Sequence, residues 1–140
     1  MAVGVQVEIP ELTEFMHGAF PGGVPWTITR LDDGGATLTM ATGDTHLRPG
    51  GTVSGPTMMM LADSAAYAVI LSRLGLQELA VTTNLTINFL RRATPGVLVA
   101  EATMLKLGRT LALAEVALHD GDPTHRVAHV VVTYSLALTI

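Results

Sequence analysis

Residues 55–74 form a stretch that is apolar on nearly every side when it is plotted as an α-helix. Ser54 suits the N-cap of such a helix, Pro56 suits its first turn, and Gly75 is typical of a helix end. A helix that is apolar all round is stable only when other elements surround it. Asp63 interrupts the stretch and leaves the apolar run too short to span a membrane. The sequence therefore predicts one long, buried, central helix.

The rest of the chain predicts mainly β-strands. A short helix begins at Pro10 and ends at the Pro21-Gly22-Gly23 breaker. Residues 82–89 alternate with a period of two, which is typical of a strand. The other expected strands cover residues 26–31, 36–42, 97–107, 111–118 and 126–138, with the first two joined by a turn at 32–35.

These elements predict a single α+β domain over residues 1–140, in which an antiparallel sheet wraps around one central helix. Several of the strands look apolar on both faces. The helix can cover one face of the sheet, but a domain of this size has no second layer for the other face. We therefore expect a second subunit to cover it.

Composition excludes several classes of function. The seven Arg and one Lys are scattered along a chain of net charge −4, which argues against nucleic-acid binding. Cysteine is absent, which excludes disulfides, zinc–thiolate sites and a cysteine nucleophile, and the five histidines show no metal-ligand spacing. The N-terminus has no basic region ahead of an apolar one, so we read no signal peptide and expect a cytoplasmic protein without a membrane anchor.

Asp63 is the residue that points most directly to chemistry. It is the only formally charged residue between Arg48 and Arg73. A carboxylate on an apolar helix loses hydration, which costs free energy unless the group is paired or hydrogen-bonded. Two interpretations follow: a nucleophile or general base held in a pocket, or a structural aspartate that caps a loop or meets an arginine such as Arg48.

Gly55 opens the predicted helix and is a candidate oxyanion donor. Its backbone N–H is one of the groups that a helix N-terminus leaves without a partner, and it has no side chain to block a carbonyl oxygen. Eight residues of helix place Gly55 and Asp63 about 12 Å apart along the axis, too far to act on one carbonyl. If both residues are catalytic, the active unit is a dimer that joins Gly55 of one chain to Asp63 of the other.

Three segments of the chain resemble one family. GTVSGPTMMMLADSA, TTNLTINFLRRA and LKLGRTLALAEVAL are similar to segments of the hotdog-fold acyl-CoA thioesterases of the PaaI-like, phenylacetate-pathway branch. The resemblance covers about residues 10–138, in the same order. In that family a His-Gly-Gly triplet opens the central helix, and an acidic residue follows about two turns later. The resemblance implies a hotdog fold.

The resemblance also assigns roles to residues of this chain. Gly55 matches the amide donor to the thioester carbonyl, Asp63 matches the acid contributed by the opposing subunit, and Thr82 matches a hydroxyl that positions the attacking water. Ser54 replaces the family histidine and can donate a hydrogen bond but cannot titrate near neutral pH. Pro56 replaces the second glycine. The candidate substrate-binding residues, most of them cations suited to the phosphates of coenzyme A, are Arg48, Arg91, Arg92, Lys106, Gly108 and Arg109.

The resulting hypothesis is an acyl-CoA thioesterase that acts as a homodimer or a dimer of dimers. Coenzyme A belongs to the substrate, and we expect no metal or redox cofactor. One alternative is hydration or dehydration of acyl thioesters on the same scaffold, which would need a histidine that reaches Asp63 across the subunit interface. The other is an acyl-CoA-binding protein that has lost catalysis together with the family histidine.

Overall fold

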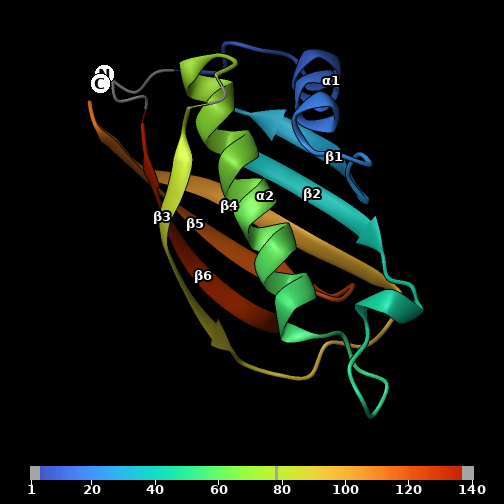
Figure 1. Ribbon diagram of the computed structural model, residues 1–140. Helices are drawn as coiled ribbons and strands as arrows, with labels where there is room; N and C mark the ends of the chain where they lie inside the picture. Colours follow the sequence, from blue (N-terminus) through green and yellow to red (C-terminus); the bar gives the residue numbers. More distant parts are fainter. Residues whose placement is uncertain (1–3, 78, 137–140) are drawn as a thin grey trace.

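The structure, a computed structural model, describes residues 4–77 and 79–136. The long helix and the six strands lie where the sequence predicts them (Figure 1), although the last strand ends at Ser135 and residues 137–138 of the expected strand lie outside the described residues. The elements are α1 (Ile9–Ala19), β1 (Trp26–Asp32), β2 (Gly35–Ala41), the single 3-10 turn η1 (Asp44–His46), α2 (Gly55–Leu74), β3 (Val81–Phe89), β4 (Val97–Leu107), β5 (Leu111–His119) and β6 (Arg126–Ser135).

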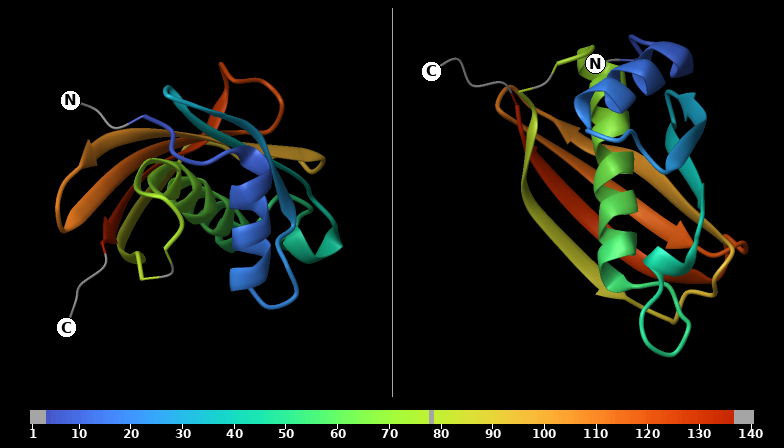
Figure 2. Two further views of the ribbon diagram at one scale, coloured as in Figure 1. Left: turned by 90° about the horizontal axis from the view of Figure 1, so that it is seen from above. Right: turned by 45° about the vertical axis from the view of Figure 1, so that its right-hand side comes forward.

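The six strands form one antiparallel sheet in the order β1-β2-β4-β5-β6-β3. The sheet curls around α2, and α1 lies beside α2 at the end of the sheet that carries β1 (Figure 2). The predicted hotdog architecture is confirmed.

Small side chains explain how α2 comes to lie so close to the sheet. Ala62, Ala65 and Ala66 on the helix are fully buried, as are Ala100 and Ala114 on the central strands β4 and β5. Alanines on both sides let the helix and the sheet approach closely without leaving voids. Although α2 is apolar throughout, no helix among the described residues is long and apolar enough to cross a membrane.

The two ends of α2 follow the local signals in the sequence. Ser54 is the N-cap, and its Oγ accepts a hydrogen bond of 3.2 Å from the backbone N–H of Thr57. Gly75 ends the helix with a φ of 89°, a left-handed conformation that glycine adopts at little cost. Both predicted capping residues are confirmed.

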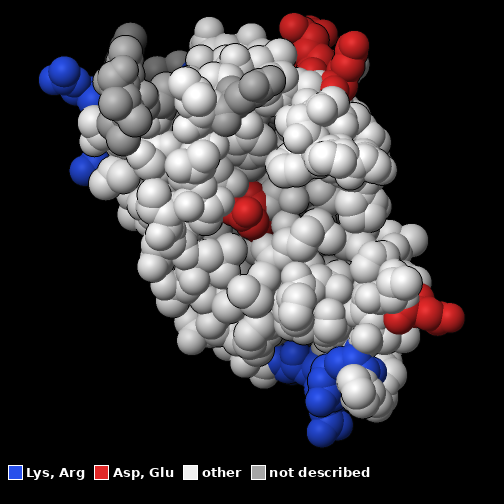
Figure 3. Space-filling view, in the orientation of Figure 1, with Lys and Arg blue, Asp and Glu red and all other residues white. Residues whose placement is uncertain are grey.

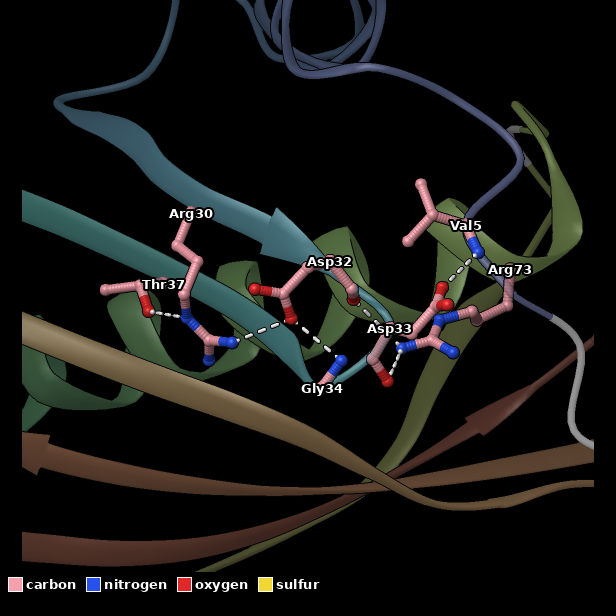
Figure 4. Close-up of polar contacts among 7 residues, drawn as sticks. All are labelled: Val5, Arg30, Asp32, Asp33, Gly34, Thr37 and Arg73. Atoms are coloured by element: carbon pink, nitrogen blue, oxygen red, sulfur yellow. Dashed lines mark hydrogen bonds and ion pairs between the residues drawn. The ribbon is translucent and has the colours of Figure 1, made fainter.

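Arg73 fixes the C-terminal end of α2 to the turn between β1 and β2 (Figure 4). Its guanidinium, in a side chain that is buried, donates hydrogen bonds to the backbone carbonyls of Asp32 at 3.2 Å and Asp33 at 2.8 Å. Asp32 stabilises the same turn, because its Oδ1 accepts from the N–H of Gly34 at 2.7 Å and from Arg30 at 2.9 Å. With both ends held, the middle of α2 has a defined position over the sheet.

The outer face of the sheet carries both apolar and charged side chains. Side chains that point away from α2 at the middle of β4, β5 and β6 include Glu101, Glu115 and His129, and His129 Nε2 lies 2.9 Å from Glu115 Oε2. Alternation along each strand puts these charged residues on the outer face together with apolar ones such as Val99, Leu113 and Val131. The predicted cover of this face by a second subunit stays a prediction. Among the described residues the sheet ends at two edge strands, β1 and β3. The helix α1 packs against β1, whereas the outer edge of β3 pairs with no strand.

Candidate active site

Asp63 lies half-buried near the middle of α2 and is held by two hydroxyl groups. Its Oδ1 accepts a hydrogen bond of 2.7 Å from Thr82 Oγ1 and one of 2.9 Å from the hydroxyl of Tyr134. Among the described residues no cation pairs with this carboxylate, so the interpretation in which Asp63 meets Arg48 is wrong. Hydroxyl donors satisfy the carboxylate without neutralising its charge.

The pairing of two strands brings these hydroxyls together. Thr82 on β3 and Tyr134 on β6 are direct partners in the antiparallel ladder. Side chains of directly opposite residues share one face of the sheet, and here that face turns toward α2. Asp63 is the only acidic residue of α2 and meets both of them. The predicted neighbours Asp63 and Thr82 are thus in contact.

Aromatic rings fix Tyr134 in place. Tyr134 is only 3% exposed and stacks on Tyr67 of α2, with ring centroids 5.6 Å apart and planes 14° from parallel. Phe20 packs edge-on against Tyr67. Burial, followed by the negative charge of Asp63, raises the pKa of the Tyr134 hydroxyl well above its usual value. Tyr134 therefore stays protonated and acts as a hydrogen-bond donor.

Asp63 borders two cavities. One, of about 460 Å³, is lined by Thr82, Tyr134 and Tyr67 and by residues 18–20 at the end of α1. The other, of about 220 Å³, is mainly apolar and includes Trp26 and Met60. Figure 3, which looks onto the face over α2, shows an acidic spot at the bottom of a hollow in a largely uncharged surface. The carboxylate is thus accessible to a small molecule from an apolar surrounding.

Gly55 lines a different cavity, of about 380 Å³, at the start of α2. Its N–H has no hydrogen-bond partner among the described residues, as expected for the first residue of a helix. Arg48, Arg91 and Arg92 line the same cavity and form the basic patch at the lower end of the molecule in Figure 3. The structure separates Gly55 from Asp63 within one chain, as the helix geometry predicts.

The candidate phosphate-binding residues divide into two groups at opposite ends of the sheet. Arg91 follows β3 and donates its backbone N–H to Val127, at the beginning of β6. Lys106, Gly108 and Arg109 lie at the turn between β4 and β5, level with the end of β6. The six residues do not form one site in a single chain.

A profile of the thioesterase superfamily matches residues 50–126, which include α2 and β3 to β5. The chain is also 38% identical to a protein of Silicibacter sp. TM1040 that is named as a candidate thioesterase, with 96% of this chain and 95% of that chain covered and a TM-score of 0.86. This chain belongs to the thioesterase superfamily. A comparison with curated proteins gave no match.

Two more distant members of the superfamily share the fold. Zebrafish thioesterase superfamily member 2 is 22% identical, with 94% of this chain and all of that chain covered and a TM-score of 0.82. A hypothetical thioesterase from Streptococcus pneumoniae, whose crystal structure contains coenzyme A, is 24% identical, with 79% and 86% covered and a TM-score of 0.71.

Tyr134 is the site residue that the sequence analysis of this superfamily member missed. The signal lies in β6, where Ala128, Val130 and Val132 occupy the inner face and Tyr134 follows them on the same face. A buried tyrosine hydroxyl needs a hydrogen-bond partner. Asp63 is the acidic residue of α2. The strand pattern and this acid together could therefore have indicated the contact between Tyr134 and Asp63.

Ser54 stabilises the start of α2 as its N-cap. Besides accepting from the Thr57 N–H, its Oγ lies 2.8 Å from Thr57 Oγ1. We expect Ser54→Ala to lower the free energy of unfolding by about 1 kcal/mol, the usual value of an N-cap side chain. Hydrolysis per folded molecule should fall only modestly, because the N–H of Gly55 remains. Urea denaturation and thiol-release kinetics on the same preparation test both effects. A loss of activity as large as that of an Asp63 variant would instead show that Ser54 makes an essential contact.

Proposed function

We propose that this protein is an acyl-CoA thioesterase in which Asp63 is the nucleophile or the general base. The observation that supports this proposal is an Asp63 carboxylate that sits in a mainly apolar hollow, is held by two hydroxyls, borders two cavities, and has no cationic partner among the described residues. An accessible carboxylate without a cationic partner can take a proton from water or attack a carbonyl carbon.

Asp63 can act as the base. Its carboxylate takes a proton from water while the water oxygen forms a bond to the thioester carbonyl carbon. The tetrahedral intermediate then collapses, its C–S bond breaks, and the thiolate of coenzyme A leaves and is protonated. With Asp63 as the nucleophile, its carboxylate oxygen attacks the same carbon, the C–S bond breaks and the thiolate of coenzyme A leaves. Water then hydrolyses the resulting anhydride, which releases the acyl group as a carboxylic acid and restores Asp63.

The oxyanion of the intermediate needs a donor that Asp63's own chain does not provide nearby. Pairing of the β3 edges of two chains could supply this donor from the partner chain. When two copies join their β3 edges antiparallel about a two-fold axis, the Phe89 end of one strand lies beside the Thr82 end of the other. In each chain the Phe89 ring covers Gly55, since a Cβ there would lie 3.3 Å from Phe89 Cζ, and Thr82 donates to Asp63. The pairing brings Gly55 of one chain toward Asp63 of its partner.

The same pairing joins the two separated groups of cations. Arg91 and Arg92 lie at the Phe89 end of β3, whereas Lys106 and Arg109 lie at the Thr82 end of the sheet. In the proposed dimer these groups come from different chains and flank the same site. Guanidinium and ammonium groups there suit the phosphates of coenzyme A, the ligand of the S. pneumoniae relative.

The PaaI-like branch is the assignment within the superfamily that the sequence supports best. The SGP triplet at 54–56 takes the place of the HGG triplet of that branch. Because Ser54 caps α2, it does not reproduce the titratable group of the family histidine. The amide of Gly55 and the carboxylate of Asp63 are retained, and the proposed hydrolysis relies on these two groups. Hydration of an acyl thioester would require a histidine that reaches Asp63 across the subunit interface, since within one chain the side chains that contact Asp63 among the described residues are hydroxyls.

A hydrolysis screen tests the proposal. We expect thiol release from at least one member of a panel of short-chain, long-chain and aromatic acyl-CoAs, at a rate well above that of the enzyme-free blank. The mainly apolar cavity beside Asp63 favours an apolar acyl group. Binding of acyl-CoA measured by calorimetry, without thiol release from any member, would support the non-catalytic alternative and reject the proposal.

A further inference from the structure

The two hydrogen bonds to the Asp63 side chain reach the same oxygen, and the Tyr134 hydroxyl also lies 3.3 Å from the Asp63 backbone carbonyl. Thr82 Oγ1 and the Tyr134 hydroxyl both donate to Oδ1, at 2.7 and 2.9 Å. The other oxygen, Oδ2, has no hydrogen-bond partner among the described residues. The two oxygens of one carboxylate therefore have different surroundings.

We propose that Tyr134 is a positioning residue for the reaction, which with Thr82 holds Oδ1 of Asp63 so that Oδ2 is the oxygen that attacks the thioester or takes the proton of water. This inference rests on the proposed function. It specifies that Oδ2 is the reacting oxygen and that Tyr134 of β6 orients the carboxylate.

Tyr134 cannot easily change its direction. Its ring is buried and stacked on Tyr67, whose own hydroxyl donates to the backbone carbonyl of Gln77 at 3.1 Å. Its ladder partner Thr82 approaches Oδ1 from the adjacent strand. Rotation of the Asp63 carboxylate would break or weaken two charge-assisted hydrogen bonds at once. The fixed sheet thus determines the orientation of a side chain on the helix.

The protonation of Tyr134 suits this role. Burial and the charge of Asp63 raise the pKa of the tyrosine hydroxyl, so that it remains a donor over the pH range in which enzymes work. Thr82 has a single hydroxyl proton, which it gives to Oδ1. Its oxygen can still accept a hydrogen bond from the attacking water. Thr82 can therefore hold both the carboxylate and the water, whereas the Tyr134 hydroxyl contacts Asp63 itself, at Oδ1 and at the backbone carbonyl.

The Tyr134→Phe variant tests the proposal, because it keeps the stacked ring and removes only the hydroxyl. We expect kcat to fall about tenfold with little change in KM, since one hydrogen bond to a charged group is lost. The acid limb of the kcat/KM profile should move to higher pH, because that hydrogen bond favours the ionised carboxylate. Adding Thr82→Val should move the limb further in the same direction.

Two control variants separate this role from a structural one. Thr83→Val removes the neighbouring hydroxyl of β3, which donates to the Thr133 carbonyl and not to Asp63. Tyr67→Phe removes the hydroxyl of the other tyrosine. We expect both controls to leave the acid limb at its wild-type pH, whatever their effect on the melting temperature.

A second measurement covers the case in which Tyr134→Phe does not fold. In the Tyr67→Phe background Tyr134 is the remaining tyrosine of the chain, so growth on 3-fluorotyrosine labels this position alone. Fluorination makes the phenol a stronger donor, and the acid limb should move to lower pH. The role of Tyr134 is overturned if the acid limb stays at its wild-type pH in Tyr134→Phe, or in the fluorinated protein where Tyr134→Phe does not fold. This conclusion requires that Asp63→Asn inactivates the enzyme. Wild-type protein without Asp63-dependent turnover overturns the proposed function and this inference with it.

Discussion

Asp63→Asn is expected to fold as the wild type does and to lose thioester hydrolysis. Asparagine keeps the shape of the side chain and one acceptor oxygen, so Thr82 and Tyr134 retain a partner. It has no charge with which to attack a carbonyl or take a proton. We expect kcat to fall by about 10²–10⁴ if Asp63 is the general base, and by more if it is the nucleophile. Thermal unfolding and thiol release are to be measured on the same preparation.

The matched control is Asp120→Asn, the same chemical change in the turn after β5. Asp120 Oδ2 accepts from the N–H of Thr94 and lines neither of the cavities at Asp63. We expect this variant to turn over at the wild-type rate. A structural Asp63 gives the reverse pattern, in which Asp63→Asn unfolds at a lower temperature but retains wild-type turnover per folded molecule. That result would reject Asp63 as the group that performs the chemistry.

Local sequence determines the parts of this fold that were predicted best. The bounds of α2 follow from Ser54 and Gly75, each of which acts within one turn of its own position. The alternation in residues 82–89 predicts β3 because the two faces of a strand differ along the chain itself. Such signals need no knowledge of which strands are neighbours.

The partners of Asp63 depend on contacts between distant parts of the chain. Tyr134 lies 71 positions after Asp63 and reaches it only through the register of β6 against β3. The charge of Asp63 suggested an arginine partner, but the interior supplies two hydroxyls. A periodic pattern predicts the face on which Tyr134 lies and not the residue opposite it.

The separation of Arg91 from Lys106 also depends on how distant strands pair. Arg91 and Lys106 both lie close to the end of a strand and look equivalent in the sequence. Three antiparallel pairings separate β3 from β4 in the sheet, so these two strands run in opposite directions and their ends point to opposite sides. One chain cannot bring these residues together because of the strand order, and the strand order cannot be predicted from periodicity.

In the proposed dimer, the backbone N–H of Gly55 is the oxyanion donor, so its removal should cause a large loss of activity. Gly55→Pro removes the backbone N–H while the helix should persist, because proline suits the first helical position and Ser54 already has the extended φ and ψ of −72° and 152° that proline favours before it. We expect a loss of about 10²–10³ in kcat. Gly55→Ala is the matched control, since it also places a Cβ against Phe89 but keeps the N–H, and it should lose much less.

Mixing the two inactive variants then tests whether the site is shared. In a heterodimer of Asp63→Asn and Gly55→Pro, one site receives Gly55 from the first chain and Asp63 from the second, and the other site receives neither. Co-refolding equal amounts should restore about a quarter of the wild-type activity, because about half of the random dimers are heterodimers and each has one intact site. The heterodimer is to be verified by capture through a tag on one chain. If captured heterodimers show no more activity than the separate variants, Gly55 and Asp63 do not act on one thioester across the β3 edge. Activity from contaminating wild-type protein would also be present in the separate variants before mixing. Activity that appears only after co-refolding, at about a quarter of the wild-type value, therefore indicates a shared site.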